Sequence, residues 1–363
     1  MNEHDDKKNH ESLRNGGKKT KSLSRRRLLK VLAAGGGAAA GTTLLPPKWI
    51  KPVMEFGALP LHAAVSPGGG PYAYITNYGS NNVSVINTAT NVVVATVAVG
   101  NRPCGIAFNP AGTRVYVANM NSNNVSVIDK ATDTVVATIA VGIGPFGIAV
   151  NRAGTFVYVA NTGSNNVSVI NTATNTVVAT IAVGTEPRGV DVNPAGTFVY
   201  VSNRLSNNVS VINTATNTVA ATVAVGNRPN GVAVNPAGTF VYVVNNSSTN
   251  VSVINTATNA VAATISMGGA GPFGIAVNPA GTFVYVTLLN DKVNVIATAT
   301  NTIVATVAVA STPLGIAVNP AGTFVYVANN DSNIVSVINT ATNTVVATVA
   351  VGSGPYAYGK FIG

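Results

Sequence analysis

The chain has 363 residues, of which 47% are hydrophobic and only 9% charged, so it is long and apolar enough to bury a large core. The formal net charge of +10 belongs mainly to residues 1–63, which hold 12 of the 21 Lys and Arg, and the nearly neutral remainder gives no ground for nucleic-acid binding through bulk charge. Cys104 is the only cysteine, which excludes an intramolecular disulfide and a cysteine-rich metal site.

The first predicted element is an N-terminal targeting segment. After a lysine-rich start, residues 24–30 read Ser-Arg-Arg-Arg-Leu-Leu-Lys and precede an apolar, glycine-rich run at 31–45. This pattern resembles a twin-arginine export signal, with Arg25 and Arg26 as the arginine pair and Leu28 in place of the usual Phe. The apolar run is shorter than the roughly 20 residues that span a bilayer. A Sec-type signal or an uncleaved anchor is the alternative.

These features divide the chain into three parts. We expect residues 1–63 to be a signal peptide of the twin-arginine type, cleaved after Ala63, and residues 64–70 to be a short flexible linker. Residues 71–363 would then form the exported domain, in the periplasm, at the cell surface or in the medium. The export machinery is the first predicted partner.

A repeat of 41 to 43 residues fills the exported part. Each copy is marked by a proline before a run that usually reads Gly-Ile/Val-Ala-Val: Pro103, Pro145, Pro187, Pro229, Pro272, Pro313 and Pro355. The third copy shows four β-prone runs, at 189–192, 198–201, 209–212 and 219–225. Asn-Pro-Ala-Gly-Thr predicts a type I turn between the first two runs, and Asn-Thr-Ala-Thr-Asn-Thr supplies an Asn able to adopt positive φ between the last two. Such a period, made only of short strands, indicates propeller blades.

A Tyr-Val-x-Asn motif marks the second run of most copies. It begins at Tyr116, Tyr158, Tyr200, Tyr242 and Tyr326, with a close variant at Tyr74, while the copy at Tyr285 lacks the Asn. In this setting the motif resembles the YVTN-repeat β-propeller family, relatives of surface-layer and periplasmic propellers of bacteria and archaea. The resemblance covers residues 71–363 and implies an exported, commonly seven-bladed propeller. We therefore expect an all-β, seven-bladed propeller of four-stranded antiparallel blades.

The two ends of the repeat array predict how the ring closes. Pro71 leads directly into the Tyr motif, so the first copy lacks its leading run, and an eighth leading run stands at 355–362. We expect this C-terminal segment to supply the inner strand of blade one, which removes an exposed sheet edge.

Differences between the copies gather on one predicted face, because the turns of the other face hardly vary. The candidate ligand-binding residues on this variable face are Arg102, Phe146, Arg188, Arg204, Arg228, Phe273 and Tyr356. Arginines among aromatic rings suit a glycan, a peptide or a cell-wall polymer as an extracytoplasmic ligand, and single-stranded nucleic acid ranks below these. The alternative is neutral drift of surface turns, with Phe side chains plugging the channel.

Catalytic side chains are scarce after the leader. Residues 64–363 contain no histidine, so a Ser-His-Asp set, a Cys-His pair and a His-ligated metal are not available there. We expect Glu186 and Asp191 to be ion-pair partners of Arg188 and Arg228, or solvated groups, more readily than an acid–base pair, with Asp191 near the channel. The prediction is a non-enzymatic binding propeller with no cofactor, catalytic site or metal site. The alternatives are a lactonase-like or quinone-linked propeller and a purely structural envelope protein.

Overall fold

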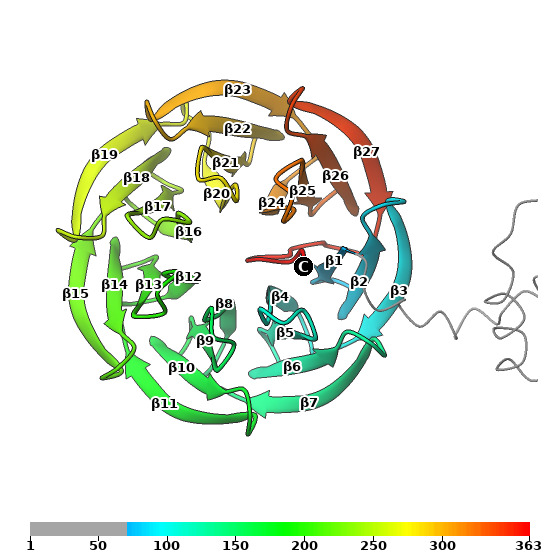
Figure 1. Ribbon diagram of the computed structural model, residues 1–363, viewed down its shortest axis with the longest axis vertical. Helices are drawn as coiled ribbons and strands as arrows, with labels where there is room; N and C mark the ends of the chain where they lie inside the picture. Colours follow the sequence, from blue (N-terminus) through cyan, green and yellow to red (C-terminus); the bar gives the residue numbers. More distant parts are fainter. Residues whose placement is uncertain (1–70) are drawn as a thin grey trace, which may run out of the picture. The chain divides into compact units, whose positions relative to one another are not determined.

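The computed structural model describes residues 71–363, so the expected signal peptide, with Arg25, Arg26 and the cleavage position after Ala63, and the linker lie outside the described residues. Within that part the regular structure is entirely β, with 27 strands of six or seven residues. They form seven antiparallel sheets around a common centre (Figure 1). The predicted seven-bladed propeller of four-stranded blades is confirmed. No helix in the described part is long and apolar enough to cross a membrane.

Each blade uses its strands in chain order from the centre outward. The inner strands of blades 2 to 7 are β4 (Pro103–Phe108), β8 (Pro145–Val150), β12 (Pro187–Val192), β16 (Pro229–Val234), β20 (Pro272–Val277) and β24 (Pro313–Val318). The second strands are β1 (Tyr72–Asn77), β5 (Arg114–Asn119), β9 (Phe156–Asn161), β13 (Phe198–Asn203), β17 (Phe240–Asn245), β21 (Phe283–Leu288) and β25 (Phe324–Asn329).

The third and outer strands complete the blades. The third strands are β2 (Asn82–Asn87), β6 (Asn124–Asp129), β10 (Asn166–Asn171), β14 (Asn208–Asn213), β18 (Asn250–Asn255), β22 (Lys292–Ala297) and β26 (Ile334–Asn339). The outer strands are β3 (Val92–Ala98), β7 (Thr134–Ala140), β11 (Thr176–Ala182), β15 (Thr218–Ala224), β19 (Ala260–Ser266), β23 (Thr302–Ala308) and β27 (Thr344–Ala350).

The core lies between neighbouring blades, because alternate residues of each strand point to opposite faces of its sheet. In β9, Tyr158 packs in a cluster with Val190 and Val201 of the next blade. Val157 and Val159 of the same strand pack in the cluster that contains Tyr116 of the preceding blade. Each Tyr-Val-x-Asn copy thus contributes side chains to the interfaces with both neighbouring blades.

The repeated turns have the conformations that their residues predict. The side-chain oxygen of Asn193 accepts hydrogen bonds from the N–H groups of Thr197, at 2.8 Å, and Phe198, at 3.0 Å. Gly196 in the same turn has a φ of 71°, a left-handed value that favours glycine. In the turn between β14 and β15, Asn217 has a φ of 53°, as expected for the Asn of that turn.

The tail, residues 355–363, closes the ring as expected but not as a regular strand. It pairs with β1 at both of its ends: Tyr356 N–H donates to Thr76 O at 2.8 Å, and Tyr74 N–H donates to Phe361 O at 2.9 Å. Between these points the tail leaves β1 and pairs with β4, where Tyr358 N–H donates to Cys104 O at 3.0 Å. Gly359, with a φ of 120°, lies in this detour. The red segment therefore reaches toward the centre of the ring (Figure 1).

A clasp from blade 2 holds the end of the tail. Lys130, in the turn between β6 and β7, donates a hydrogen bond from Nζ to the carbonyl oxygen of Gly363 at 2.8 Å. Asp133 of the same turn accepts one from the Tyr74 hydroxyl of β1 at 2.6 Å. Both residues replace the Thr or Asn that most other copies carry at these positions.

Candidate functional site

The two ends of the central channel differ. The variable face carries the connections that enter the inner strands and the turns between second and third strands. The turn face, on the other side, carries the Asn-Pro-Ala-Gly-Thr turns. Inner strands begin at the variable face and end at the turn face, so each strand contributes residues to both ends.

At the variable face the channel is closed by an aromatic plug, formed by Phe146, Phe273, Tyr356 and Tyr358. The rings of Phe146 and Tyr358 lie 5.1 Å apart between centroids, and those of Phe273 and Tyr356 lie 5.8 Å apart, both edge to face. Cys104 and Leu314 complete the buried cluster. Burial raises the pKa of the Tyr358 hydroxyl well above its ordinary value, although the charge of Arg188 acts in the opposite direction.

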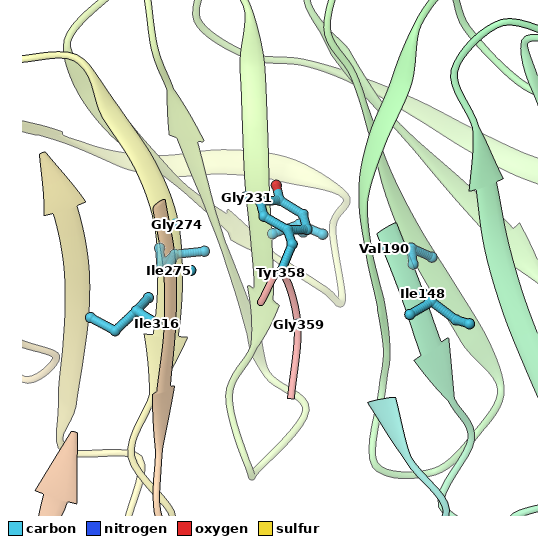
Figure 2. Close-up of a pocket in the computed structure, with 10 residues that line it drawn as sticks. Ile148, Val190, Gly231, Gly274, Ile275, Ile316, Tyr358 and Gly359 are labelled. Carbon is cyan, nitrogen blue, oxygen red and sulfur yellow. The ribbon is translucent and has the colours of Figure 1, made fainter. Parts of the chain in front are cut away.

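A small cavity of about 30 Å³ lies under the plug. Figure 2 shows the Tyr358 ring between Ile148 and Val190 on one side and Ile316 on the other, with Gly359 directly after it. This volume holds about one water molecule. It is a gap in the packing and too small for an organic ligand.

Three of the predicted ligand-binding residues belong to this aromatic plug. Phe146 and Phe273 are 3% and 9% exposed, and Tyr356 packs between them. These rings leave little surface for a ligand, which agrees with the alternative that Phe side chains plug the channel. A ligand-binding role for the arginines stays a prediction.

The structure brings two of the predicted arginines onto one carboxylate. Glu186 accepts from Arg188 at 2.6 Å and from Arg204 at 2.9 Å. Burial alone would raise the pKa of Glu186, but the hydrogen bonds and charges of the two arginines outweigh it and hold the pKa below its ordinary value. Arg188 also stacks over the Phe146 ring, with its guanidinium carbon 4.9 Å from the centroid.

The remaining predicted residues lie on the same face. The guanidinium carbon of Arg102 lies 5.1 Å from the centroid of the Tyr78 ring, and Arg228 is exposed at the start of β16. Cys104 is fully buried among these groups. Burial raises the pKa of its thiol to about 12, although the charges of Arg188 and Arg102 act in the opposite direction. The thiol is therefore protonated at neutral pH and a poor nucleophile.

The turn face holds a cavity of about 540 Å³, within the range of small-molecule sites. Its wall is formed by the last residues of the inner strands and the turns that follow them, and Gly359, Lys360, Ile362 and Gly363 of the tail line one side. Apolar side chains such as Val232 and Ile275 line most of it. This cavity lies at the opposite end of the channel from the predicted ligand-binding residues and was not predicted from the sequence.

Among residues 71–363, Asp191 is the one acidic side chain that lines this cavity. It stands in β12 where the other inner strands carry Ala, at positions 107, 149, 233, 276 and 317. The side chain is buried. One oxygen accepts from Val192 N–H at 2.9 Å and from Lys360 Nζ at 3.0 Å, and the other accepts from Val234 N–H at 2.9 Å. Its ion-pair partner is therefore Lys360 of the tail, not the expected Arg188 or Arg228.

Two cations accompany Asp191. Lys360 has a side chain that is 75% exposed, and Arg152 is exposed at the rim. Arg152 stands where nearly all other copies of this turn have Pro. Each of the two replacements, Ala by Asp and Pro by Arg, breaks an otherwise repeated pattern, and this signal could have found the site from sequence. Within residues 71–363 no three His, Cys, Asp or Glu side chains group in a way that could hold a metal ion.

Comparison with protein families gives a match to part of the chain. A family model described as "Lactonase, 7-bladed beta-propeller" matches residues 129–225. This stretch runs from the end of β6 through β15 and contains both Arg152 and Asp191. Among curated proteins, the PE-PGRS family protein PE_PGRS18 of Mycobacterium tuberculosis (strain ATCC 25618 / H37Rv) is 49% identical over 51 residues. That alignment covers 14% of this chain and 11% of the relative.

Solved propellers resemble the chain over most of its length. The hydrazine synthase of Kuenenia stuttgartiensis has a TM-score of 0.68 and 26% identity, over 74% of this chain and 92% of that one. A putative 6-phosphogluconolactonase from Bacteroides uniformis ATCC 8492 has a TM-score of 0.68 and 18% identity, over 79% and 98%. A functionally unknown protein from Desulfotomaculum acetoxidans DSM 771 has 0.70 and 18%, over 80% and 98%. The last two similarities show the fold alone.

These matches correct one prediction from the sequence. The absence of histidine and of an acid pair led us to expect a non-enzymatic protein, whereas the match of residues 129–225 to a lactonase family model points toward an enzyme. The lactonase-like alternative is better supported than the non-enzymatic binding propeller. The resemblance to YVTN-repeat propellers stays a prediction.

Proposed function

We propose that this protein is a lactonase-like hydrolase whose active site is the cavity of the turn face, with Asp191 as its central carboxylate. The observation that carries the proposal is the position of the family-model match. Residues 129–225 contain Asp191 and Arg152, which both line the 540 Å³ cavity. The same stretch also contains residues of the closed end, so it is the cavity volume that favours the turn face as the place for a substrate.

The chemistry of lactone hydrolysis suits the groups present. Water adds to the ring carbonyl carbon, the bond to the ring oxygen breaks, and the proton taken from water returns to the released alkoxide. Asp191 is held by two backbone N–H groups, and within the described part of the chain its Oδ2 accepts one hydrogen bond, from Val234 N–H. A carboxylate oxygen can accept two hydrogen bonds, so Oδ2 has capacity for the attacking water.

The two cations have complementary roles in this proposal. Lys360 Nζ, 3.0 Å from Asp191 Oδ1, places a positive charge where the carbonyl oxygen becomes negative. Arg152 at the rim would orient substrates that carry a carboxylate or phosphate. The apolar wall supplies low-dielectric surroundings for the buried carboxylate of Asp191.

The substitutions that test this proposal are taken from the residues that other repeats carry at the same positions. Asp191→Ala gives β12 the residue that the equivalent position of other blades carries, so the variant should fold. We expect wild-type protein to hydrolyse members of a panel of γ- and δ-lactones, followed by titration of the acid released. Asp191→Ala should lower kcat/KM by about 100-fold or more.

Two further variants separate a catalytic effect from a structural one. Arg152→Pro restores the common turn and should raise KM for anionic lactones while kcat changes little. Glu186→Gln, at the opposite end of the channel, should leave kcat/KM unchanged. The proposal fails if the wild-type protein hydrolyses no lactone of the panel, or if Asp191→Ala retains its activity with a cooperative melting transition.

A further inference from the structure

The residue before the inner-strand proline has a left-handed backbone in most blades. The φ values are 52° at Arg102, 67° at Gly144, 56° at Glu186, 53° at Arg228, 55° at Thr312 and 63° at Gly354. The geometry has a common cause, because each N–H donates to a side-chain oxygen of a neighbouring turn. Examples are Arg102 to Asn81 and Arg228 to Asn207, both at 2.9 Å. Glycine adopts this conformation without strain, and two of these copies have it.

Charged side chains therefore occupy three positions where glycine fits the backbone better. Arg102, Glu186 and Arg228 belong to blades 2, 4 and 5, and each accepts a conformation that L-residues rarely adopt. Thr312 has the same conformation, so the left-handed backbone is a property of the repeated turn that these charged residues occupy.

These positions belong to a basic arc, which we define as Arg102, Arg188, Arg204 and Arg228. Glu186 neutralises only one of the two arginines that it binds, so the arc with Glu186 has a formal charge of +3. Blades 6 and 7 contribute Asp291, Lys292 and Asp331 to the same face, with a formal charge of −1. The inner strands β4, β8, β12 and β16 of the basic half follow one another around the ring (Figure 1).

The side chains around the arc favour some classes of anionic partner over others. The aromatic rings here are already covered, since Phe146 packs against Tyr358 and under Arg188, and Tyr78 lies under Arg102. A sugar ring or a nucleobase would need an open aromatic face to stack on. The exposed apolar side chains are instead aliphatic: Ile143 is 62% exposed and Leu205 54% exposed.

We propose that the basic arc is a docking site for an acidic peptide segment that also carries apolar side chains. Guanidinium groups bind carboxylates through paired hydrogen bonds, and Ile143 and Leu205 give aliphatic side chains a place to pack. The arc lies at the opposite end of the channel from the proposed hydrolytic cavity. The two sites can therefore be tested and lost separately.

The experiment replaces the strained arginines with the residue that the backbone favours. Fluorescence anisotropy would follow a labelled peptide of Glu and Leu residues binding to the wild-type protein and to Arg102→Gly/Arg228→Gly. We expect the double variant to bind at least about tenfold more weakly, and the salt dependence of binding to decrease. Because glycine relieves two left-handed positions, we also expect its melting temperature to be unchanged or higher.

Lys292→Ala is the matched control, because it removes one positive charge from the same face outside the arc. It should bind the peptide within twofold of wild type. Oligogalacturonate and oligothymidylate of equal charge serve as competitors. The proposal is overturned if the wild-type protein does not bind the peptide, if the double variant binds as well as wild type, or if either competitor binds more tightly.

Discussion

The two ends of the propeller channel are built from the same inner strands, yet one is closed and the other is open. At the variable face the residue after the proline is large in several blades, as with Phe146, Phe273 and Leu314, and these side chains meet in the centre. Near the turn face, the fifth residue of the inner strand is Ala in most blades, and this small side chain leaves a cavity of about 540 Å³. Side-chain volume at two positions of one strand thus decides where a small molecule can enter.

The difference also shows what variation among repeats means. The variable face differs from copy to copy, but part of that variety fills the plug. The turn face is nearly uniform, and two of its exceptions, Arg152 and Asp191, line one cavity. A single replacement within a repeated turn is therefore a stronger indication of a site than general variability.

The largest effect is expected from removing the C-terminal tail, which contributes side chains to both ends of the channel. Deleting residues 354–363 takes away Tyr358 from the plug, Lys360 from the cavity and the fully buried Phe361 from the core. The loss of several buried side chains should lower the free energy of unfolding by roughly 5 kcal/mol or more, and the melting temperature by roughly 10 °C or more. Calorimetry measures both. An unchanged melting temperature would refute closure of the ring by the tail.

The second test opens the closed end alone. Phe146→Ala should lower the free energy of unfolding by about 3–5 kcal/mol, because the ring is 3% exposed and its removal leaves a cavity between the two Tyr side chains. Phe283→Ala removes the same group from a residue that is 37% exposed and should cost about 1 kcal/mol. Urea denaturation of both variants gives the difference. Equal losses would mean that the plug does not contribute packing energy of its own.

The smallest expected effect concerns the charges around the closed end. Since the pKa of Glu186 is lower in the folded protein than in the unfolded chain, its ionised form stabilises the fold above the unfolded pKa. This stability is lost as the pH falls through the folded pKa. Glu186→Gln should therefore be less stable than wild type by about 1 kcal/mol at pH 7, and this difference should shrink as the pH falls below the unfolded pKa. Urea midpoints against pH would show it, and a difference that grows in acid would contradict the ion pairs.

Much of the fold could be predicted because each repeat carries its own turn chemistry. The Asn-Pro-Ala-Gly-Thr turn and the positive-φ Asn specify strand connections locally, and the period specifies blades. The predicted signal peptide, with Arg25 and Arg26, lies outside the described residues and stays a prediction.

The arrangement at the channel could not be predicted in the same way. The detour of the tail depends on Gly359 at a φ of 120° and on the fit of Tyr358 among side chains from distant blades, such as Phe146 and Phe273. The pairing of Lys360 with Asp191 depends on that detour, so the residues of the cavity become neighbours only when the ring is closed.

The clasp in blade 2 has a consequence for a chain made of look-alike units. A tail that met the wrong blade would find almost the same strands, so backbone pairing alone discriminates poorly between closures. Lys130 and Asp133 differ from their counterparts in most other copies, and they bind Gly363 and Tyr74 respectively. A mis-registered ring would lose these contacts together with the pairing of Lys360 and Asp191. These contacts thus stabilise the correct pairing of the tail over pairings with other, nearly identical blades.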